Sequence, residues 1–351
     1  MSVLGLDIGT STCKGIVLSK NGNILLQKQV DYSSAVQVRG EAAEIDPAVF
    51  RDSAAEVIRS LAAKVLEDPI EAIAVSSHGE TLIPIGADGA PLMNAMLSMD
   101  RRCEKQVEQL VASLGEEKIY SVTGALPHSQ FPIPKIMWLQ EEHPEIASVV
   151  TNFDTASDYI HRCLGIPGYV DYSMASRFGG FDVKRHKWSE EILGAAQISP
   201  ELFSKPVCGG TRLGKIPREI AAQLGLSDSV WLVAGGHDQP CAAIGMGVVD
   251  TDTITVSAGS YECAARIYAQ PANNAEGMRY GLNSYCHVLP DQYITLAFFV
   301  SGMMAKWYLD TFCEAEKRMA AQEKRSIFDF MEAASLILWK NPSGKAPQAS
   351  V

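Results

Sequence analysis

The stretch that most constrains this chain is Leu4 to Leu18, which reads LGLDIGTSTCKGIVL. An apolar run over 3–8 carries one carboxylate, Asp7, near its end. A turn of small and hydroxyl residues follows at 9–12, and a second apolar run covers 15–18. Short apolar runs separated by turn-forming residues predict two strands joined by a tight turn.

The turn between the two strands has two interpretations. Its backbone N–H groups and the hydroxyls of Thr10, Ser11 and Thr12 can cradle a phosphate chain, while Asp7 holds Mg²⁺ through water. Turns of this composition are also common where they only join strands. The turn by itself does not decide between these interpretations.

The composition restricts the class of protein. With 351 residues, of which 47% are hydrophobic, the chain can build two domains with cores of their own. Its formal net charge of −11 argues against nucleic acid and anionic membranes as partners. The eight cysteines form no C-x-x-C pair, which is typical of reduced thiols. Since no apolar run is long enough to span a bilayer, we expect a cytoplasmic protein.

Beyond the first turn, the order of the expected elements indicates a three-layer α/β domain. A strand pattern covers 23–30, and Asp46-Pro47 marks the start of a helix. A continuous apolar run at 70–76 then predicts a strand buried on both faces. The segment 100–223 is mainly helical by pattern, with a turn-rich loop at 171–176.

A second strand–turn–strand pattern appears at 254–268. Its Gly259-Ser260 pair echoes Gly9-Thr10 in the opening turn. This echo predicts two related halves, and we place the domain boundary near 248. A strand and then a helix are expected over 293–309.

The carboxylate of Asp238 follows an apolar strand and two glycines, and it opens a helix. One interpretation is a helix N-cap, which position alone favours. The other is a general base that accepts a hydroxyl proton as a phosphoryl group arrives, because phosphoryl transfer needs mainly alignment and charge neutralisation. Gly235 and Gly236 lack side chains and so permit a ligand to approach closely.

The polar sequence SSHGET at 76–81 lies between two predicted strands. Small ligands often bind where polar loops follow the strands of a sheet. His78 and Glu80 can bind sugar hydroxyls, which need both donors and acceptors. A solvated loop explains the same residues equally well.

A series of short segments, in this order along residues 3–345, resembles the FGGY carbohydrate kinases, within the larger clan of sugar kinases, heat-shock proteins and actin. The segments are DIGTST with Lys14 (7–14), EIDP (44–47), SSHGET (76–81), Asp100 with Arg102, PKIMWL (134–139), DYSMAS (171–176), GGHDQPCAAIGMG (235–247), AGS (258–260) and SGMMAKW (301–307).

The resemblance implies an α/β fold of two ribonuclease-H-like domains, as in the actin-like ATPase clan, around a cleft. Residues 1–247 would form the sugar-binding domain, and residues 248–351 the first part of the nucleotide-binding domain. The implied reaction is ATP-dependent phosphorylation of a sugar hydroxyl. A pentulose or hexulose such as xylulose is favoured over glycerol, because Gly79 stands where glycerol kinases carry an arginine.

The resemblance also implies a role for each matching residue. Asp238 would be the catalytic base, and Asp7 would hold Mg²⁺ through water. Substrate contacts would come from His78, Glu80, Asp100, Arg102, Asp238 and Gln239. The phosphates of ATP would bind to Gly9, Thr10, Ser11, Thr12, Lys14, Gly259 and Ser260.

Family chains continue beyond the segments matched here, and the further part supplies the glycine-rich adenosine loop. The resemblance therefore implies an incomplete second domain, with unpaired strand edges and exposed apolar surface. An alternative function is a sugar-binding remnant with impaired catalysis. A chaperone-like or actin-like ATPase fits less well, because SSHGET and GGHDQ suit a small polyhydroxylated substrate. A homodimer is an option that the resemblance leaves open.

Overall fold

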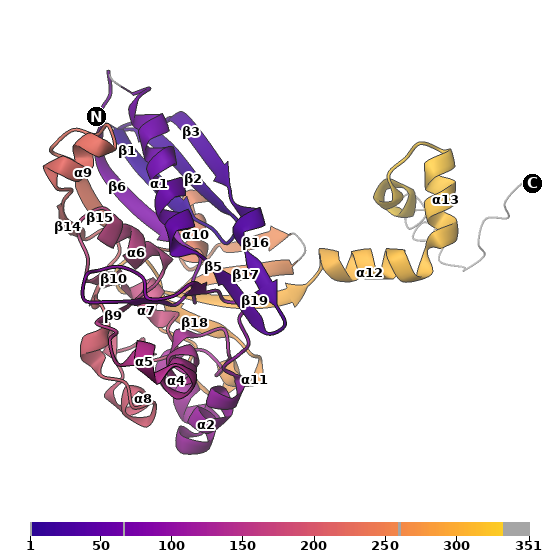
Figure 1. The fold of residues 1–351 in the computed structure, drawn as a ribbon. Helices are drawn as coiled ribbons and strands as arrows, with labels where there is room; N and C mark the ends of the chain where they lie inside the picture. The colour runs from indigo at the N-terminus through magenta and orange to yellow at the C-terminus, as the bar shows by residue number, and fades with distance from the viewer. Residues whose placement is uncertain (1, 66, 259–260, 333–351) are drawn as a thin grey trace, which may run out of the picture. The chain divides into compact units, whose positions relative to one another are not determined.

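The central sheet contains the opening strands of the chain. A computed structural model describes residues 2–65, 67–258 and 261–332, without the side chains of residues 258 and 261. Within this part the sheet has six strands in the order β14-β15-β6-β1-β2-β3 (Figure 1). They are β1 (Ser2–Ile8), β2 (Thr12–Ser19), β3 (Ile24–Asp31), β6 (Ile70–Ser77), β14 (Arg212–Lys215) and β15 (Trp231–His237).

The directions of these strands set the position of the site. Strand β1 pairs antiparallel with β2 and parallel with β6, and β6 pairs parallel with β15. The predicted strand–turn–strand at the start of the chain is therefore confirmed. The strand predicted at 70–76 is also confirmed, but it is not buried on both faces, because Glu71 is exposed and Ala72, Ala74 and Ser76 are half-buried. Because β1, β6 and β15 run parallel, their carboxyl ends lie along one edge of the sheet.

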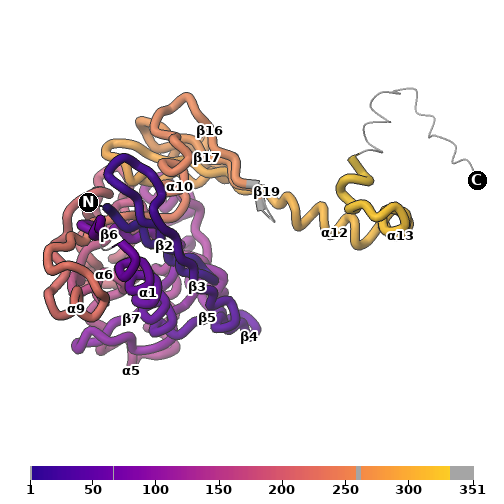
Figure 2. The backbone as a smooth tube through the Cα atoms, turned by 90° about the horizontal axis from the view of Figure 1, so that it is seen from above, coloured from indigo at the N-terminus to yellow at the C-terminus, as the bar shows by residue number. Residues whose placement is uncertain are grey.

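Helix α1 (Pro47–Ala62) covers β2 and β3 on one face of the sheet (Figure 2). It begins as predicted, because the Asp46 side chain accepts the Ala48 N–H at 2.8 Å and Pro47 occupies the first helical position. Its apolar side, which includes Phe50 and Val57, is fully buried. Each such side chain contributes about 1.5–3 kcal/mol of burial free energy.

The predicted helical character of the middle of the chain is confirmed. The helices are α2 (Glu104–Leu114), α3 (Glu116–Thr123), α4 (Pro132–Glu142), α5 (Pro144–Ala147), α6 (Ala156–Cys163), α7 (Tyr172–Ser176), α8 (Glu190–Ala195) and α9 (Arg218–Gln223). The short strands β4 (Gln37–Arg39), β5 (Ala42–Ile45), β7 (Ile83–Ile85) and β8 (Ala95–Met96) precede these helices, and β9 (Asn152–Asp154), β10 (Tyr169–Asp171), β11 (Phe181–Asp182), β12 (Lys187–Trp188) and β13 (Lys205–Val207) lie between them.

The loop predicted at 171–176 is wrong, because these residues form the start and body of α7. The carboxylate of Asp171 accepts the backbone N–H groups of Ser173 and Met174 and so caps the helix. Asp and Ser favour both turns and helix N-termini, and the pattern does not distinguish the two. Burial raises the pKa of Asp171 to about 6, although hydrogen bonds from Ser173 and Met174 oppose the rise.

The remaining elements follow His237. They are α10 (Asp238–Gly245), β16 (Ile254–Ala258), β17 (Tyr261–Tyr268), α11 (Ala275–Arg279), β18 (Asn283–Cys286), β19 (Tyr293–Val300), α12 (Gly302–Phe312) and α13 (Glu314–Gln322). The strands predicted within 254–268, and the strand and helix predicted over 293–309, are thus confirmed. The turn residues Gly259 and Ser260 lie outside the described residues.

The chain separates into two compact units. The first comprises 1–255 and 265–297, and the second comprises 256–264 and 298–351. The first unit contains the central sheet and also the β18·β19 ladder, in which Tyr285 pairs with Ile294. The predicted domain division into 1–247 and 248–351 stays a prediction.

Candidate active site

Three parallel strands bring the polar residues of the site together. In the sheet register Asp7 of β1 lies beside Ser76 of β6, and Ser76 lies beside Gly236 of β15. One position further along, Ser77 pairs with His237. The residues that follow these strands, among them Asp238, therefore share one edge of the sheet.

The carboxylate of Asp7 is only partly hydrogen-bonded within the described residues. Its Oδ1 is buried and has no hydrogen-bond partner among the described residues. Burial raises the pKa of Asp7, while Lys14, Ser76 and His78 act in the opposite direction. An unpartnered buried carboxylate oxygen fits a hydrated Mg²⁺. Over the described ranges no three His, Cys, Asp or Glu side chains gather as a metal site, so such an ion would take its other ligands from water and phosphate.

The turn after β1 is held by backbone contacts that leave its side chains available. The Gly9 N–H donates to the Thr12 carbonyl at 2.9 Å, and the Tyr32 hydroxyl donates to the Gly9 carbonyl at 2.5 Å. The half-buried hydroxyls at 10–12 have no hydrogen-bond partner within the described part of the chain. Three such hydroxyls, in the turn that follows the strand of Asp7, can donate hydrogen bonds to a phosphate group.

Asp238 is the first residue of α10, and the N-cap position belongs to His237. The Asp238 side chain is 36% exposed, and its Oδ1 lies 3.2 Å from Nε2 of His237. That oxygen has no hydrogen-bond partner among the described residues. A capping role, the simpler interpretation of the sequence, is thus not what this conformation shows.

The electrostatic surroundings of Asp238 favour proton uptake near neutral pH. Burial raises its pKa to about 7, and the negative charges of Glu80 and Asp7 add to the rise. A backbone hydrogen bond from Gln239 and the charge of Arg177 act against it. A carboxylate in this range can accept a proton and release it again at physiological pH.

Glu80 forms a buried pair with Arg177, a residue that no sequence motif singles out as functional. Arg177 Nε lies 2.6 Å from Oε1 of Glu80, and Nη2 contacts the same oxygen. The guanidinium lies over the rings of Phe131 and Tyr285, at 5.1 and 4.8 Å from their centroids. Burial alone would raise the pKa of Glu80, but Arg177 and the other nearby cationic groups hold it below its ordinary value.

His78 is buried, and both of its ring nitrogens are engaged. Nδ1 lies 2.8 Å from the Ile8 carbonyl and must donate to it, so Nε2 accepts the hydroxyl hydrogen of Thr81 at 2.5 Å. Burial lowers the pKa of His78, which keeps the ring neutral. Its predicted contact with a sugar stays a prediction, and in this conformation the ring instead joins the ends of β1 and β6.

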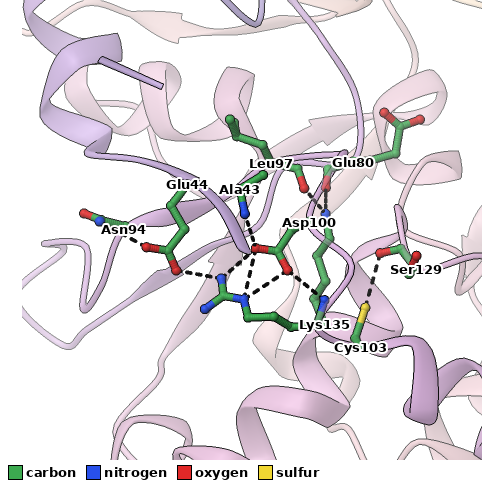
Figure 3. Close-up of polar contacts among 10 residues, drawn as sticks. Ala43, Glu44, Glu80, Asn94, Leu97, Asp100, Cys103, Ser129 and Lys135 are labelled. Carbon is green, nitrogen blue, oxygen red and sulfur yellow. Dashed lines mark hydrogen bonds and ion pairs between the residues drawn. The ribbon is translucent and has the colours of Figure 1, made fainter. Parts of the chain in front are cut away.

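Asp100, which Figure 3 shows near Ala43 and Glu44, pairs with Arg102. The fully buried Asp100 carboxylate accepts the Ala43 N–H at 2.9 Å and Nη2 of Arg102 at 2.7 Å. Arg102 also contacts Oε1 of Glu44 at 2.6 Å and lies over the Trp138 ring. Their predicted substrate contacts are untested, and the described contacts brace β5 against the segment that follows Asp100.

The other predicted site residues lie close to these groups or outside the described part of the chain. Lys14 is exposed on β2 opposite Asp7, and Gln239 is half-buried directly after Asp238. Gly259 and Ser260 are not among the described residues. A large surface hollow of about 1010 Å³ lies elsewhere, between 114–126 and 273–279, and it contains none of the predicted site residues.

Comparison with known families and proteins gives a consistent result. The model of the "FGGY family of carbohydrate kinases, N-terminal domain" matches residues 2–245. A xylulose kinase of Lactococcus lactis is 27% identical over 313 residues, which cover 88% of this chain and 61% of that protein. A gluconokinase of Bacillus subtilis is also 27% identical, over 91% of this chain and 62% of that protein.

Solved structures share the fold. A ligand-bound xylulose kinase from Lactobacillus acidophilus superposes with a TM-score of 0.83 at 24% identity, over 95% of this chain and 66% of that one. A gluconate kinase from the same species gives a TM-score of 0.84 at 24% identity, over 95% of this chain and 65% of that one. The predicted α/β fold is confirmed as the actin-like ATPase fold of these sugar kinase structures, which extend beyond the part that this chain covers.

Two further findings concern the length of the chain relative to its relatives and the apolar character of its helices. The chain spans between 60 and 69% of the length of the curated relatives compared with it, and 61% of the Lactococcus lactis protein. Over the part of the chain that the structure describes, no helix combines the length and apolar character needed to cross a bilayer.

Proposed function

Because this chain belongs to the FGGY family of carbohydrate kinases, we propose that it carries the substrate site and the catalytic base of an ATP-dependent sugar kinase. The observation that supports this most directly is Asp238. It combines a carboxylate oxygen without a hydrogen-bond partner in the described structure, a pKa raised to about 7 and a place directly after β15, whose end lies at the same edge of the sheet as Asp7. Phosphorylation of a hydroxyl requires a carboxylate oxygen that is available to accept the hydroxyl proton.

In the proposed reaction the sugar hydroxyl gives its proton to the Asp238 carboxylate. The oxygen of that hydroxyl forms a bond to the γ-phosphorus of ATP, the bond from this phosphorus to the β–γ bridging oxygen breaks, and ADP leaves with the electron pair. The transition state is loose, so alignment and charge neutralisation account for most of the catalysis. Asp238 then returns its proton to solvent.

Phosphate binding is assigned to the first turn. We propose that the turn at 9–12 and Lys14 bind the phosphates of ATP, together with Gly259 and Ser260. Asp7 would hold Mg²⁺ through water, and the ion would neutralise charge on the transferred group. The unpartnered hydroxyls and the unpartnered Asp7 oxygen described above support this assignment.

For the substrate we propose a pentulose or hexulose, with xylulose first and contacts from Glu80, His78, Asp100, Arg102 and Gln239. Relatives named xylulose kinase support this choice, although a gluconokinase is equally similar. The space around Gly79 supports it further. A Cβ at that position would lie 3.0 Å from the His237 ring and 3.1 Å from Cγ of Arg177, so the arginine of glycerol kinases would displace both side chains.

The second candidate function is a sugar-binding protein with impaired catalysis. Sugar binding without ADP release would distinguish it from the first candidate. A cytoplasmic location, where ATP is supplied, and a possible homodimer complete the proposal.

The first experiment measures ADP release by residues 1–351 with Mg-ATP across ketoses, aldoses, polyols and aldonates, with titration calorimetry of the same sugars. Sugar-dependent release that Asp238→Asn abolishes, with sugar affinity preserved, is the expected result. Binding without release would favour the second candidate. If no sugar binds, the substrate assignment is wrong. Glu80→Ala should weaken sugar binding but not nucleotide binding, whereas equal losses would indicate misfolding.

A further inference from the structure

Lys135, a buried residue near the start of α4, contacts the backbone of Glu80. Lys135 has no exposed surface, and its Nζ donates to the carbonyl of Glu80 and to the carbonyl of Leu97, each at 2.7 Å (Figure 3). Within the described residues it makes no ion pair with a carboxylate. A buried ammonium held mainly by neutral carbonyls is a costly arrangement for a fold.

The backbone conformation of Glu80 gives the buried Lys135 ammonium a role. Glu80 has a φ of 63°, in the left-handed region that non-glycine residues seldom adopt. This conformation is energetically unfavourable and persists only where neighbouring groups impose it. The Lys135 hydrogen bond holds the carbonyl of the same residue, and therefore acts directly on the strained peptide.

The same end of α4 also holds the partner of the Glu80 carboxylate. The Ile133 N–H donates to the Phe178 carbonyl at 3.0 Å, next to Arg177 in the chain. The ring of Phe131, the residue before α4, lies against the Arg177 guanidinium. The N-terminal end of α4 therefore contacts both the backbone of Glu80 and the arginine that binds its side chain.

We propose that Lys135 is a positioning residue that fixes the Glu80 backbone and thereby sets the affinity for the sugar. This inference rests on the proposed function, because it takes Glu80 as a sugar contact. Through the Leu97 carbonyl, which also accepts the Asp100 N–H at 3.0 Å, Lys135 ties Glu80 to the segment of Asp100. Burial lowers the pKa of Lys135 to about 8, against the opposing effects of Cys103, Asp100 and Glu80.

The test compares Lys135→Met with Ile136→Val in the full chain. Ile136 is the next residue of α4 and is equally buried, so its substitution reports loss of packing in the same helix. We expect Lys135→Met to weaken sugar binding about tenfold or more, a change that corresponds to loss of one good polar contact. Nucleotide affinity and melting temperature should stay near wild type, because removal of the buried charge offsets the two lost hydrogen bonds. Ile136→Val should leave sugar affinity unchanged.

Hydrogen exchange provides a readout that does not depend on any sugar. Amides of 78–82 should exchange faster in Lys135→Met than in wild type, while those of α1 stay protected. Unchanged exchange at 78–82, or unchanged sugar affinity, would overturn the inference. If wild type binds no sugar, the proposed function fails, and exchange still decides whether Lys135 holds Glu80. Should Lys135→Met not fold, Lys135→Gln retains a donor and is expected to give an intermediate change in both measurements.

Discussion

Glu80 and Arg177 lie 97 residues apart in the sequence, yet Arg177 Nε is 2.6 Å from Oε1 of Glu80 in a pair that is almost fully buried. Arg177 Nη1 is also buried and has no hydrogen-bond partner among the described residues. The pair therefore engages Oε1 of Glu80 and leaves the N–H groups of Nη1 for another acceptor. A sugar hydroxyl is the acceptor that the proposed function would supply.

Removal of one partner of this pair should destabilise the protein strongly. Arg177→Met leaves the buried Glu80 carboxylate without compensation, and we expect a loss of about 3–5 kcal/mol in the free energy of unfolding. Urea denaturation at pH 7 measures it. The double variant Glu80→Gln with Arg177→Met should recover part of the loss, since it removes both charges of the pair. A loss below about 1 kcal/mol in the single variant would mean that water reaches the pair.

The rate of sugar phosphorylation should fall in acid. A base must be ionised to accept the hydroxyl proton, and burial raises the pKa of Asp238 to about 7. The turnover rate should therefore drop as pH falls through 7, approaching tenfold per unit below that value. Steady-state ADP release between pH 5.5 and 8.5 measures it. A profile that stays flat down to pH 5 would show that the base is not Asp238.

Asp238 should also lower the stability of the folded protein at high pH. The folded pKa of about 7 exceeds the ordinary value of 3.8, so the folded state binds the proton more tightly than the unfolded state. The stability that this proton contributes is lost as pH rises through 7. Asp238→Asn should then melt higher than wild type at pH 8, with a smaller difference at pH 5. An equal difference at both pH values would contradict the raised pKa.

Asp7→Asn should separate nucleotide binding from sugar binding. The amide cannot supply the negative charge that Mg²⁺ needs, while the fold loses no hydrogen bond at Oδ1. We expect Mg-ATP affinity to fall about tenfold, the equivalent of one charge-assisted contact. Calorimetry with and without Mg²⁺ tests this, and sugar affinity is the control. A variant with unchanged Mg²⁺ dependence would remove Asp7 from the metal site.

Several local features were predictable because the determining residues are neighbours in the chain. Asp46 and Pro47 start α1 through a cap and a preset φ, and the apolar runs at 3–8 and 70–76 become adjacent strands. The error at 171–176 has a local cause as well. Asp171 caps a helix with contacts that would suit a turn equally well.

The order of the residues was enough to predict the family, the strands β1, β2 and β6, the start of α1, and the motifs that follow β1, β6 and β15, because these depend on residues close together in the chain. Tertiary packing was needed to establish that Arg177 faces Glu80, that Lys135 holds the Glu80 carbonyl and that both nitrogens of His78 are engaged. It was also needed for the raised pKa of Asp238. The physical reason is burial, since desolvation and long-range ion pairs depend on which distant segments pack around a charge.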